Sequence, residues 1–571
     1  MQLNLNLPAK LPTHAYEYGN RTSGEVHGVV LTKPHIVELI LDLAGYTADR
    51  DLGAMSLLEP SCGHGAFLIP AVVRLLDSAK REGRSVASLE KSVLAVDIDA
   101  AHVEKTKQAL LKVLLHHEVS KPVRERLVEA WVTEDDFLLT PLDRQFDVVV
   151  GNPPYIRIEQ LSETLQAEYR RRYRTLYDRA DIYVAFIERG LTLLSKAGVL
   201  SFICADRWIL NKYGAPLRAL VSSRFKIRCY IDLHKASPFE SDVIAYPSIF
   251  VMSPDRKGDA GPNAHGDPIP VVILETGSAE ECLAVPRILD GTAQELPGGV
   301  SVAKYSAWFA GDDPWVLSSP AHLETLRALE AKFSPIDSTA RVAIGVATGH
   351  DKLYIVGADA DIETDRLVPL VMRDDIEKGR IKDGGRFVIN TFVEGGQVVD
   401  LDHYPRLRKY LAKHASAIKN RHVAKKNPGS WFRTIDRVYP TLVKVPKLLI
   451  PDIAGSNEVV FEEGHYHPHH NLYFITSEQW DMEVLGGLLS SKVALFFVWS
   501  YAVKMRGGYL RFQAQYLRRI RLPDPKAISA KQAKAIKTAF QTRDFARLDE
   551  LALAAYGLAA LPAFDFVDTR R

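Results

Sequence analysis

The feature that most constrains the fold is an apolar run that ends abruptly in a proline turn, Val148-Val149-Val150-Gly151-Asn152-Pro153-Pro154-Tyr155. Three consecutive β-branched residues are typical of a central strand in a parallel sheet. The two prolines fix φ and remove two N–H donors, so the turn cannot continue into a helix. The turn leaves the Asn152 amide, the Pro153 carbonyl and the Tyr155 ring exposed. Two acceptors beside one flat face suit a planar ring that carries an amino group.

The segment upstream predicts the opening unit of a doubly wound sheet. A short strand at 56–58 leads into the loop Glu59-Pro60-Ser61-Cys62-Gly63-His64-Gly65, and a helix follows from Ala66 to about Lys80. A second strand, 93–96, ends in Asp97-Ile98-Asp99, where an acid is placed to bind a ribose diol. The alternative for Asp97 is a helix N-cap, which Asp99 could equally be. Loop and acid together predict a cofactor that contains adenosine.

Two further features flank this unit. A helix is predicted to begin at Pro34, with Thr32 as a candidate cap two positions earlier. After a third strand, near residues 131–133, Asp136 could accept a hydrogen bond from an adenine amino group, and Phe137 could cover that ring. A solvated acidic turn is the alternative for Asp136.

Composition limits the class of protein. The 571 residues predict two or more domains, and 47% hydrophobic with 25% charged residues is ordinary for a globular chain. The net charge of +2 means that any nucleic-acid surface must be local. The four cysteines form no CxxC pair, the first ten residues lack a secretory pattern, and no apolar run reaches the length of a membrane span. A cytoplasmic protein is therefore expected.

Basic residues are concentrated in two late segments. Residues 404–447 hold 12 Lys/Arg against one acid, a net charge of +11, with Trp431, Phe432 and Tyr439 interleaved. Residues 492–523 add seven Lys/Arg and no acid. Basic residues mixed with aromatics are typical of a surface that follows nucleic-acid phosphates, and a solvated basic face is the alternative. The residues predicted to bind DNA are Lys425, Lys426, Trp431, Arg433, Lys504, Arg506 and Arg511.

A histidine cluster, His465, His467, His469 and His470, surrounds Pro468. Alternating histidines could share one face of a strand and bind a metal ion. Because no acid or cysteine completes a ligand pattern nearby, the sequence favours a polar hairpin, and no metal site is expected.

The order of these motifs resembles the gamma class of N6-adenine DNA methyltransferases, the TaqI-like type. The resemblance continues through residues 181–186, 198–203, 238–239 and 248–252. It implies S-adenosylmethionine as the cofactor and Phe239 as an aromatic that holds a flipped-out base. The cofactor-binding residues would be Thr32, Glu59, Pro60, Ser61, Gly63, Gly65, Asp97, Ile98, Asp136 and Phe137, and the catalytic residues Asn152, Pro153, Pro154, Tyr155 and Phe239.

The resemblance also implies an architecture and a function. A doubly wound, Rossmann-like α/β sheet would occupy residues 1–275, a bridging segment 276–335, a C-terminal α+β target-recognition domain 336–526, and a helical tail 527–571. The implied activity is site-specific methylation of adenine N6 in double-stranded DNA, on a base flipped out of the duplex, within a restriction–modification system. Whether a separate restriction endonuclease exists stays open, and a monomer is expected.

Two other readings of the same motifs stay open. Enzymes that methylate RNA or a protein glutamine also use an Asn-Pro-Pro-Tyr turn, usually within a single catalytic domain, so the basic second domain favours DNA. The other is a DNA-binding protein with an inactive methyltransferase fold, and the intact Asn152 and Asp97 argue against it.

Overall fold

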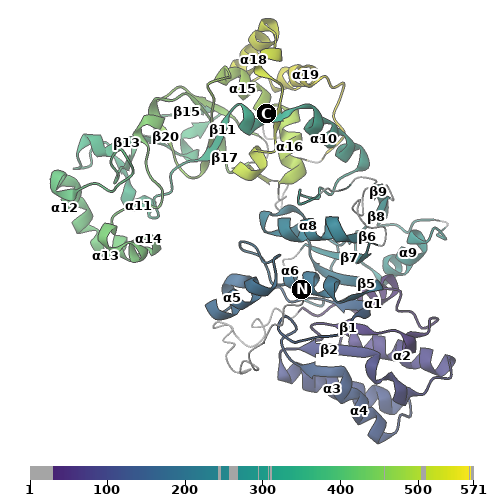
Figure 1. The fold of residues 1–571 in the computed structure, drawn as a ribbon. Coiled ribbons are helices and arrows are strands. Elements are labelled where there is room, and N and C mark those ends of the chain that lie inside the picture. The colour runs from purple at the N-terminus through teal and green to yellow at the C-terminus, as the bar shows by residue number, and fades with distance from the viewer. Residues whose placement is uncertain are drawn as a thin grey trace, which may run out of the picture. The chain divides into compact units, whose positions relative to one another are not determined.

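The computed structural model describes residues 30–241, 246–255, 268–293, 295–305, 308, 311–454, 457–502, 509–564 and 566. The chain divides into two compact units, unit 1 over Met1–Val316 and unit 2 over Leu317–Arg571 (Figure 1). Each unit is built around its own sheet or sheets, so each is described by itself.

Unit 1 is built on a nine-stranded sheet with the order β3-β2-β1-β4-β5-β7-β6-β8-β9. The first five strands of that order are parallel, β7 runs antiparallel to both of its neighbours, β8 is parallel to β6, and β9 closes the edge in the antiparallel sense. The strands are β1 Leu57–Glu59, β2 Val93–Asp97, β3 Val132–Glu134, β4 Phe146–Gly151, β5 Leu194–Ala205, β6 Phe225–Asp232, β7 Pro247–Pro254, β8 Ile269–Leu274 and β9 Val300–Tyr305. The predicted α/β class is confirmed.

Strand β4 lies inside this sheet, between β1 and β5, as its sequence predicts. Val148, Val149 and Val150 are all fully buried. Their strand pairs with β1 through Leu57↔Val148 and with β5 through Val148↔Val199. The chain reaches β2 and β3 on one side of β1 and then crosses to β4 on the other side, so the strand order reverses between β1 and β4. A reversal of this kind opens a crevice beyond the carboxyl ends of the two strands.

Helices pack against this sheet, among them α1 and α6 on β5 and α8 on β6. In Figure 1, α3 and α4 lie beside the β2 end of the sheet, where their contacts with β2 and β3 place them. The helices of unit 1 are α1 Pro34–Leu43, α2 Leu68–Arg81, α3 Ala100–His116, α4 Lys121–Trp131, α5 Glu163–Arg172, α6 Tyr183–Thr192, α7 Arg207–Leu210, α8 Ala215–Arg224 and α9 Ala279–Leu289. Residues 276–305, in the segment predicted as a bridge, supply α9, which contacts α1, and β9, which pairs with β8.

The N-termini of α1 and α3 show which residues cap these two helices. Helix α3 is capped by Asp99, whose carboxylate accepts from the backbone N–H of Ala101 at 2.8 Å and of His102. Asp97 is therefore not the cap. The prediction that Thr32 caps α1 is wrong, because Pro34 is the first helical residue and the N-cap is Lys33, which makes no side-chain cap. Thr32 instead forms a β-bridge with Phe239.

Unit 2 contains two four-stranded sheets and two groups of helices. One sheet has the antiparallel order β11-β21-β17-β19, with β11 Arg341–Ile344, β21 Leu472–Thr476, β17 Lys447–Pro451 and β19 Val460–Glu462. The other has the order β12-β16-β13-β20, with β12 Ile355–Gly357, β16 Arg386–Ile389, β13 Leu367–Val371 and β20 His467–Pro468.

The helices of unit 2 gather at its two ends, as Figure 1 shows. One group is α12 Pro405–Lys413, α13 Ala415–Lys419 and α14 His422–Lys426; the other contains α10 Pro320–Lys332, α15 Met482–Leu489, α16 Lys492–Tyr501, α18 Ala530–Thr542 and α19 Phe545–Tyr556. Among the described residues no single helix is long and apolar enough to cross a membrane, and the pair α15–α16 reaches that length only across a bend of 60°.

Candidate active site

An open cavity lies at the carboxyl ends of β1, β2 and β4. Residues from segments far apart in the sequence meet there. The predicted site residues in its lining are Thr32, Glu59, Pro60, Ser61, Gly63, Asp97, Ile98, Asp136, Phe137, Asn152 and Pro154. Gly65, Pro153, Tyr155 and Phe239 are not among the lining residues. The crevice that the strand order predicts is therefore present, and its lining includes nine of the ten predicted cofactor-binding residues but only Asn152 and Pro154 of the five predicted catalytic residues.

The glycine loop after β1 is tied to the acid at the end of β2. The backbone N–H of Gly63 donates to Asp97 Oδ2 at 2.7 Å, and the Thr106 hydroxyl donates to the Gly63 carbonyl at 2.8 Å. Gly65 has a φ of 81°, and a Cβ there would lie 3.2 Å from both Ile69 and Thr106. Glycine is therefore required at position 65 for the loop to turn back onto α2 and α3.

Asp97 is nearly buried and already holds two groups through its other oxygen. Asp97 Oδ1 accepts from the backbone N–H of Asp99 at 3.0 Å and lies 3.3 Å from His102 Nδ1. The hydrogen bond to Asp97 is the main reason that the pKa of His102 is raised. Each carboxylate oxygen has two lone pairs, so Asp97 can still accept a further hydrogen bond from the cavity.

Glu59 is a second carboxyl group in the cavity, and its environment differs from that of Asp97. The Glu59 side chain is 1% exposed, and its Oε2 has no hydrogen-bond partner among the described residues. Burial, with the nearby charge of Asp97, holds the pKa of Glu59 well above its usual range. Glu59 is therefore held toward its neutral form, in which it can donate as well as accept a hydrogen bond.

Asp136 and Phe137 form the opposite wall. Asp136 accepts from the Tyr169 hydroxyl at 2.7 Å and from the backbone N–H of Leu138 at 2.8 Å. Burial raises the pKa of Asp136, and the Tyr169 hydroxyl opposes that rise. The Phe137 ring packs against Phe186, with 5.2 Å between ring centroids. The wall therefore offers a fixed carboxylate beside an aromatic surface.

Asn152 is held by its amide nitrogen, and this leaves its oxygen free. Asn152 Nδ2 donates to the Val30 carbonyl at 3.0 Å and to the Thr32 hydroxyl at 3.3 Å. Because a carbonyl can only accept, the amide nitrogen must be the atom that faces Val30. Asn152 Oδ1 is buried and has no hydrogen-bond partner among the described residues. A buried acceptor without a partner is costly, so it indicates a binding site for a donor.

Tyr155 and Phe239 are not among the residues that line the cavity, and their rings lie against each other. Their ring centroids are 6.4 Å apart with the planes at 73°, an edge-to-face arrangement. Phe239 is 6% exposed and belongs to the core cluster of unit 1. Its backbone is fixed because Lys33 N–H donates to the Pro238 carbonyl at 3.0 Å and Glu240 N–H to the Leu31 carbonyl at 2.9 Å.

The predicted DNA-binding residues divide into three groups. Lys425 and Lys426 end α14 and are exposed, whereas Trp431 and Arg433 are half-buried a few residues later. Arg511 forms an ion pair with Asp452, which compensates its charge. Lys504 and Arg506 lie outside the described residues.

Several cavity residues were missed by sequence reasoning. They belong to helices, to helix starts and to the chain before α1, and no motif in the sequence around them indicates a site. These residues are Val30, Phe67, Tyr169, Ile182 and Phe186. His64 and His102 could have been found, because His64 stands inside the glycine loop and His102 in the first turn of the helix that follows Asp97.

The strand order, the glycine loop and the acid at the end of β2 define the class of this protein: the fold and the cavity are those of an α/β methyltransferase. Comparison with known proteins agrees. Residues 85–239 match the family model described as Eco57I restriction-modification methylase. The chain is 43% identical over 557 residues to the Type II methyltransferase M.BstVI of Geobacillus stearothermophilus, covering 94% of this chain and 97% of that protein. It is 44% identical over 542 residues to M.PaeR7I of Pseudomonas aeruginosa, covering 94% and 92%.

The chain therefore belongs to the type II restriction–modification methyltransferases. It is a DNA methyltransferase of a restriction–modification system, and S-adenosylmethionine is its methyl donor. The fold is also found in the Type IIL restriction-modification enzyme MmeI, whose structure was solved in complex with DNA. The TM-score is 0.58 at 12% identity, over 93% of this chain and 74% of that one.

The raised pKa of Glu59 predicts a pH-dependent gain in stability when its charge is removed. In the unfolded chain Glu59 loses its proton near pH 4.5, whereas the folded chain keeps it to higher pH, so the wild type loses stability as the pH rises. Glu59→Gln avoids this loss. We expect no gain below about pH 4 and a gain that grows by about 1.4 kcal/mol for each pH unit above it, up to the folded pKa.

Calorimetric unfolding between pH 4 and 8 measures this difference. Glu295→Gln, at an exposed glutamate of the same unit, is the matched control and should show no pH-dependent gain. Equal curves for Glu59→Gln and the wild type would contradict the raised pKa.

Proposed function

We propose that this chain is a gamma-class, TaqI-like methyltransferase that methylates N6 of an adenine flipped out of double-stranded DNA. The observation that carries the proposal is the partnerless Oδ1 of Asn152, buried at the end of β4 beside the cavity. An exocyclic amino group would supply the missing donor. The restriction endonuclease of the system would be a separate chain, and the methyltransferase would act as a monomer.

The residues of the cavity suit the methyl donor. S-adenosylmethionine supplies an electrophilic methyl group on a positively charged sulfur, and four carboxyl groups, Glu59, Asp97, Asp135 and Asp136, line the cavity. We assign Asp97 to the ribose hydroxyls, because it is fixed by Gly63 and keeps accepting capacity. We assign Asp136 and Phe137 to the adenine of the cofactor, one to its amino group and one to its ring face.

Asn152 and the Pro153 carbonyl would make the amino group reactive. The lone pair of adenine N6 is delocalised into the ring, so N6 must become pyramidal to attack. Each of the two oxygens would accept one N6 hydrogen, and both hydrogen bonds strengthen as the nitrogen becomes positive. The N–C bond forms as the S–C bond breaks, and one N6 proton is then released. Since that proton becomes acidic during the reaction, a strong base is not required.

Tyr155 and Phe239 would hold the base. An adenine inside a duplex cannot reach the end of β4, so it must leave the stack. A base at Asn152 would stack on Tyr155 and meet the edge of Phe239, which is fixed by its pairing with residue 32. Both aromatic groups are held before substrate arrives, so little ordering is needed when the base enters.

We propose that unit 2 contains the target-recognition domain, over residues 336–526. The basic segment 404–447 is the main support, because phosphate contacts provide affinity that does not depend on sequence. Not all of this segment is available. Arg421 is buried and donates to the carbonyls of Thr348 and Arg433, and Lys447 is buried in an ion pair with Glu462. The exposed Lys425 and Lys426 are better candidates for phosphate contacts.

Asn152→Ala should nearly abolish methyl transfer while the affinity for S-adenosylmethionine stays unchanged. The variant loses the acceptor Oδ1 but none of the proposed cofactor contacts. Turnover with tritiated methyl donor on DNA measures the first quantity, and calorimetry without DNA measures the second. Digestion of the wild-type product to nucleosides should place the label on N6-methyladenine. Label on cytosine, on RNA or on a protein glutamine would contradict the proposed substrate.

Asp97→Asn should weaken binding of S-adenosylmethionine about tenfold or more. Losing a charge-assisted hydrogen bond to the ribose costs roughly 1.5–3 kcal/mol. Asp99→Ala is the matched control, because it removes the cap of α3, which costs about 1 kcal/mol of stability, without changing a cavity-lining residue. Equal affinities of the two variants would exclude Asp97 from the cofactor site.

Replacing Lys425 and Lys426 together with glutamine should flatten the salt dependence of DNA binding. Each lost phosphate contact lowers the slope of log K against log salt by about 0.9 for duplex DNA. The control variant replaces the exposed Lys531 and Lys534, in the same unit but outside the basic segment. A salt titration that gives the same slope for both variants would remove α14 from the DNA interface.

A further inference from the structure

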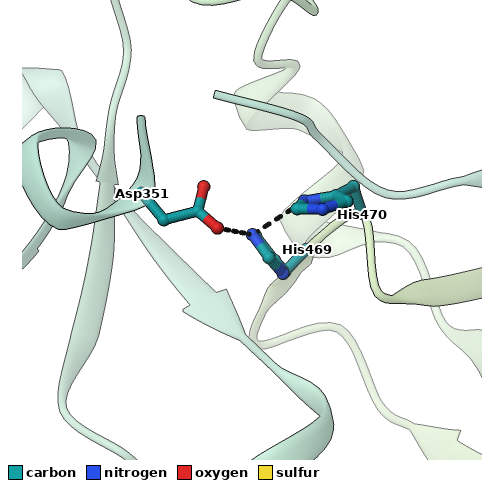
Figure 2. A group of neighbouring side chains, drawn as sticks. All are labelled: Asp351, His469 and His470. Atoms are coloured by element: carbon teal, nitrogen blue, oxygen red, sulfur yellow. Dashed lines mark hydrogen bonds and ion pairs between the residues drawn. The ribbon is translucent and has the colours of Figure 1, made fainter. Parts of the chain in front are cut away.

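Three side chains of unit 2 converge on one point, far along the chain from the cavity of unit 1 (Figure 2). They are Asp351, His469 and His470. His469 Nε2 lies 3.1 Å from Asp351 Oδ2 and 2.9 Å from His470 Nδ1. The donor atoms of all three residues lie within 4.8 Å of one another.

The backbone around these residues is fixed before any ligand is considered. Asp351 begins the helix α11, Asp351–Tyr354, and the Thr348 hydroxyl donates to its Oδ1 at 2.6 Å, which turns Oδ2 toward His469. The histidines directly follow β20. His470 N–H donates to the Val346 carbonyl at 3.0 Å, which ties the two segments together. An outer group that orients a ligating carboxylate is a usual part of metal sites.

Hydrogen bonding alone leaves this cluster poorly satisfied. His469 Nε2 faces two groups but can carry only one proton. When it is protonated, the carboxylate and His470 compete for a single N–H, and when it is not, its lone pair faces a carboxylate oxygen. The His469 side chain is 2% exposed, and its Nδ1 has no hydrogen-bond partner among the described residues.

The types of side chain in the cluster suit a cation. The cluster thus presents two imidazole nitrogens and one carboxylate oxygen. His470 is exposed, so one side of the cluster is open to solvent.

We propose that Asp351, His469 and His470 bind a divalent transition-metal ion, with Zn²⁺ as the best match. Nitrogen and carboxylate ligands with an open position are typical of Zn²⁺, whereas Mg²⁺ and Ca²⁺ take oxygen ligands. The ion would join two segments 118 residues apart. It would also steady the basic segment, since Ile435 N–H and Asp436 N–H donate to the carbonyls of Thr348 and Ala347. The metal site does not depend on the proposed choice of adenine.

The other two histidines of this segment, His465 and His467, are not among the proposed metal ligands. His467 is buried, its Nδ1 lies 3.0 Å from the Pro468 carbonyl, and burial lowers its pKa to about 4. His465 is exposed. The substitution His465→Ala therefore provides a control, because it removes an imidazole from the same segment without changing any of the proposed ligands.

The experiment uses the full-length protein after treatment with a chelator. Titration with Zn²⁺ should show one ion bound to each chain. The melting temperature should rise by roughly 5–10 °C when free Zn²⁺ is about 100 times its dissociation constant. Mg²⁺ at the same concentration should have no such effect. Co²⁺ should produce visible absorption bands, which report nitrogen and oxygen ligands directly.

His470→Ala and Asp351→Asn should each weaken Zn²⁺ affinity at least about tenfold and remove the cobalt bands, whereas His465→Ala should behave as the wild type. The metal-dependent rise in melting temperature is compared within each variant, so a loss of intrinsic stability does not affect the result. Absence of Zn²⁺ binding by the wild type would overturn the proposal. An equal loss in His465→Ala would move the site away from Asp351.

Discussion

The pairing of β1 with β4 is the constraint on which the rest of unit 1 depends. Through Leu57↔Val148 these strands end side by side, so the loop after β1 and the turn after β4 meet at one edge. The Ser61 hydroxyl then donates to the Asn152 carbonyl at 3.2 Å across the two segments. A shift of one residue in this register would move every side chain of β4 to the opposite face of the sheet and offset the two loops. The position of the cavity therefore depends on the pairing of the apolar strand β4 with β1.

Four carboxyl groups line the cavity, and three of them, Glu59, Asp97 and Asp136, differ in their partners. Asp97 accepts from backbone N–H groups, and Asp136 accepts from the Tyr169 hydroxyl and a backbone N–H. Glu59 accepts from the backbone N–H of Leu68, but its Oε2 has no hydrogen-bond partner among the described residues. Burial raises the pKa of both Glu59 and Asp136, and for Asp136 the Tyr169 hydroxyl opposes that rise.

Local patterns in the sequence predicted an inner strand of the sheet and 11 of the 23 residues that line the cavity. Strand β4, the glycine loop and the acid after β2 follow from residues that are adjacent in the chain. What could not be predicted depends on distant partners. Tyr169 reaches Asp136 from a separate helix, and Thr32 serves Asn152 instead of capping α1. The acid beside the histidine cluster, Asp351, precedes His469 by 118 residues, so the sequence around the histidines does not reveal it.

The charge of the basic segment, residues 404–447, also could not be judged from the sequence alone. A count of Lys and Arg along the chain does not show which of them are buried or paired with acids. Beyond the buried Arg421 and Lys447, the residues of α12 are paired with acids that precede the segment, namely Arg406–Glu363, Arg408–Asp402 and Lys409–Asp361. No such ion pair within the described residues compensates Lys413, Lys419, Lys425, Lys426, Arg433, Arg437 or Lys444. The uncompensated charge thus begins at the end of α12. Exposed pairs contribute little to stability, but they do cancel the local field. An anion as extended as DNA would therefore be attracted to residues 413–444, the stretch that Ile435 and Asp436 tie to the backbone beside Asp351.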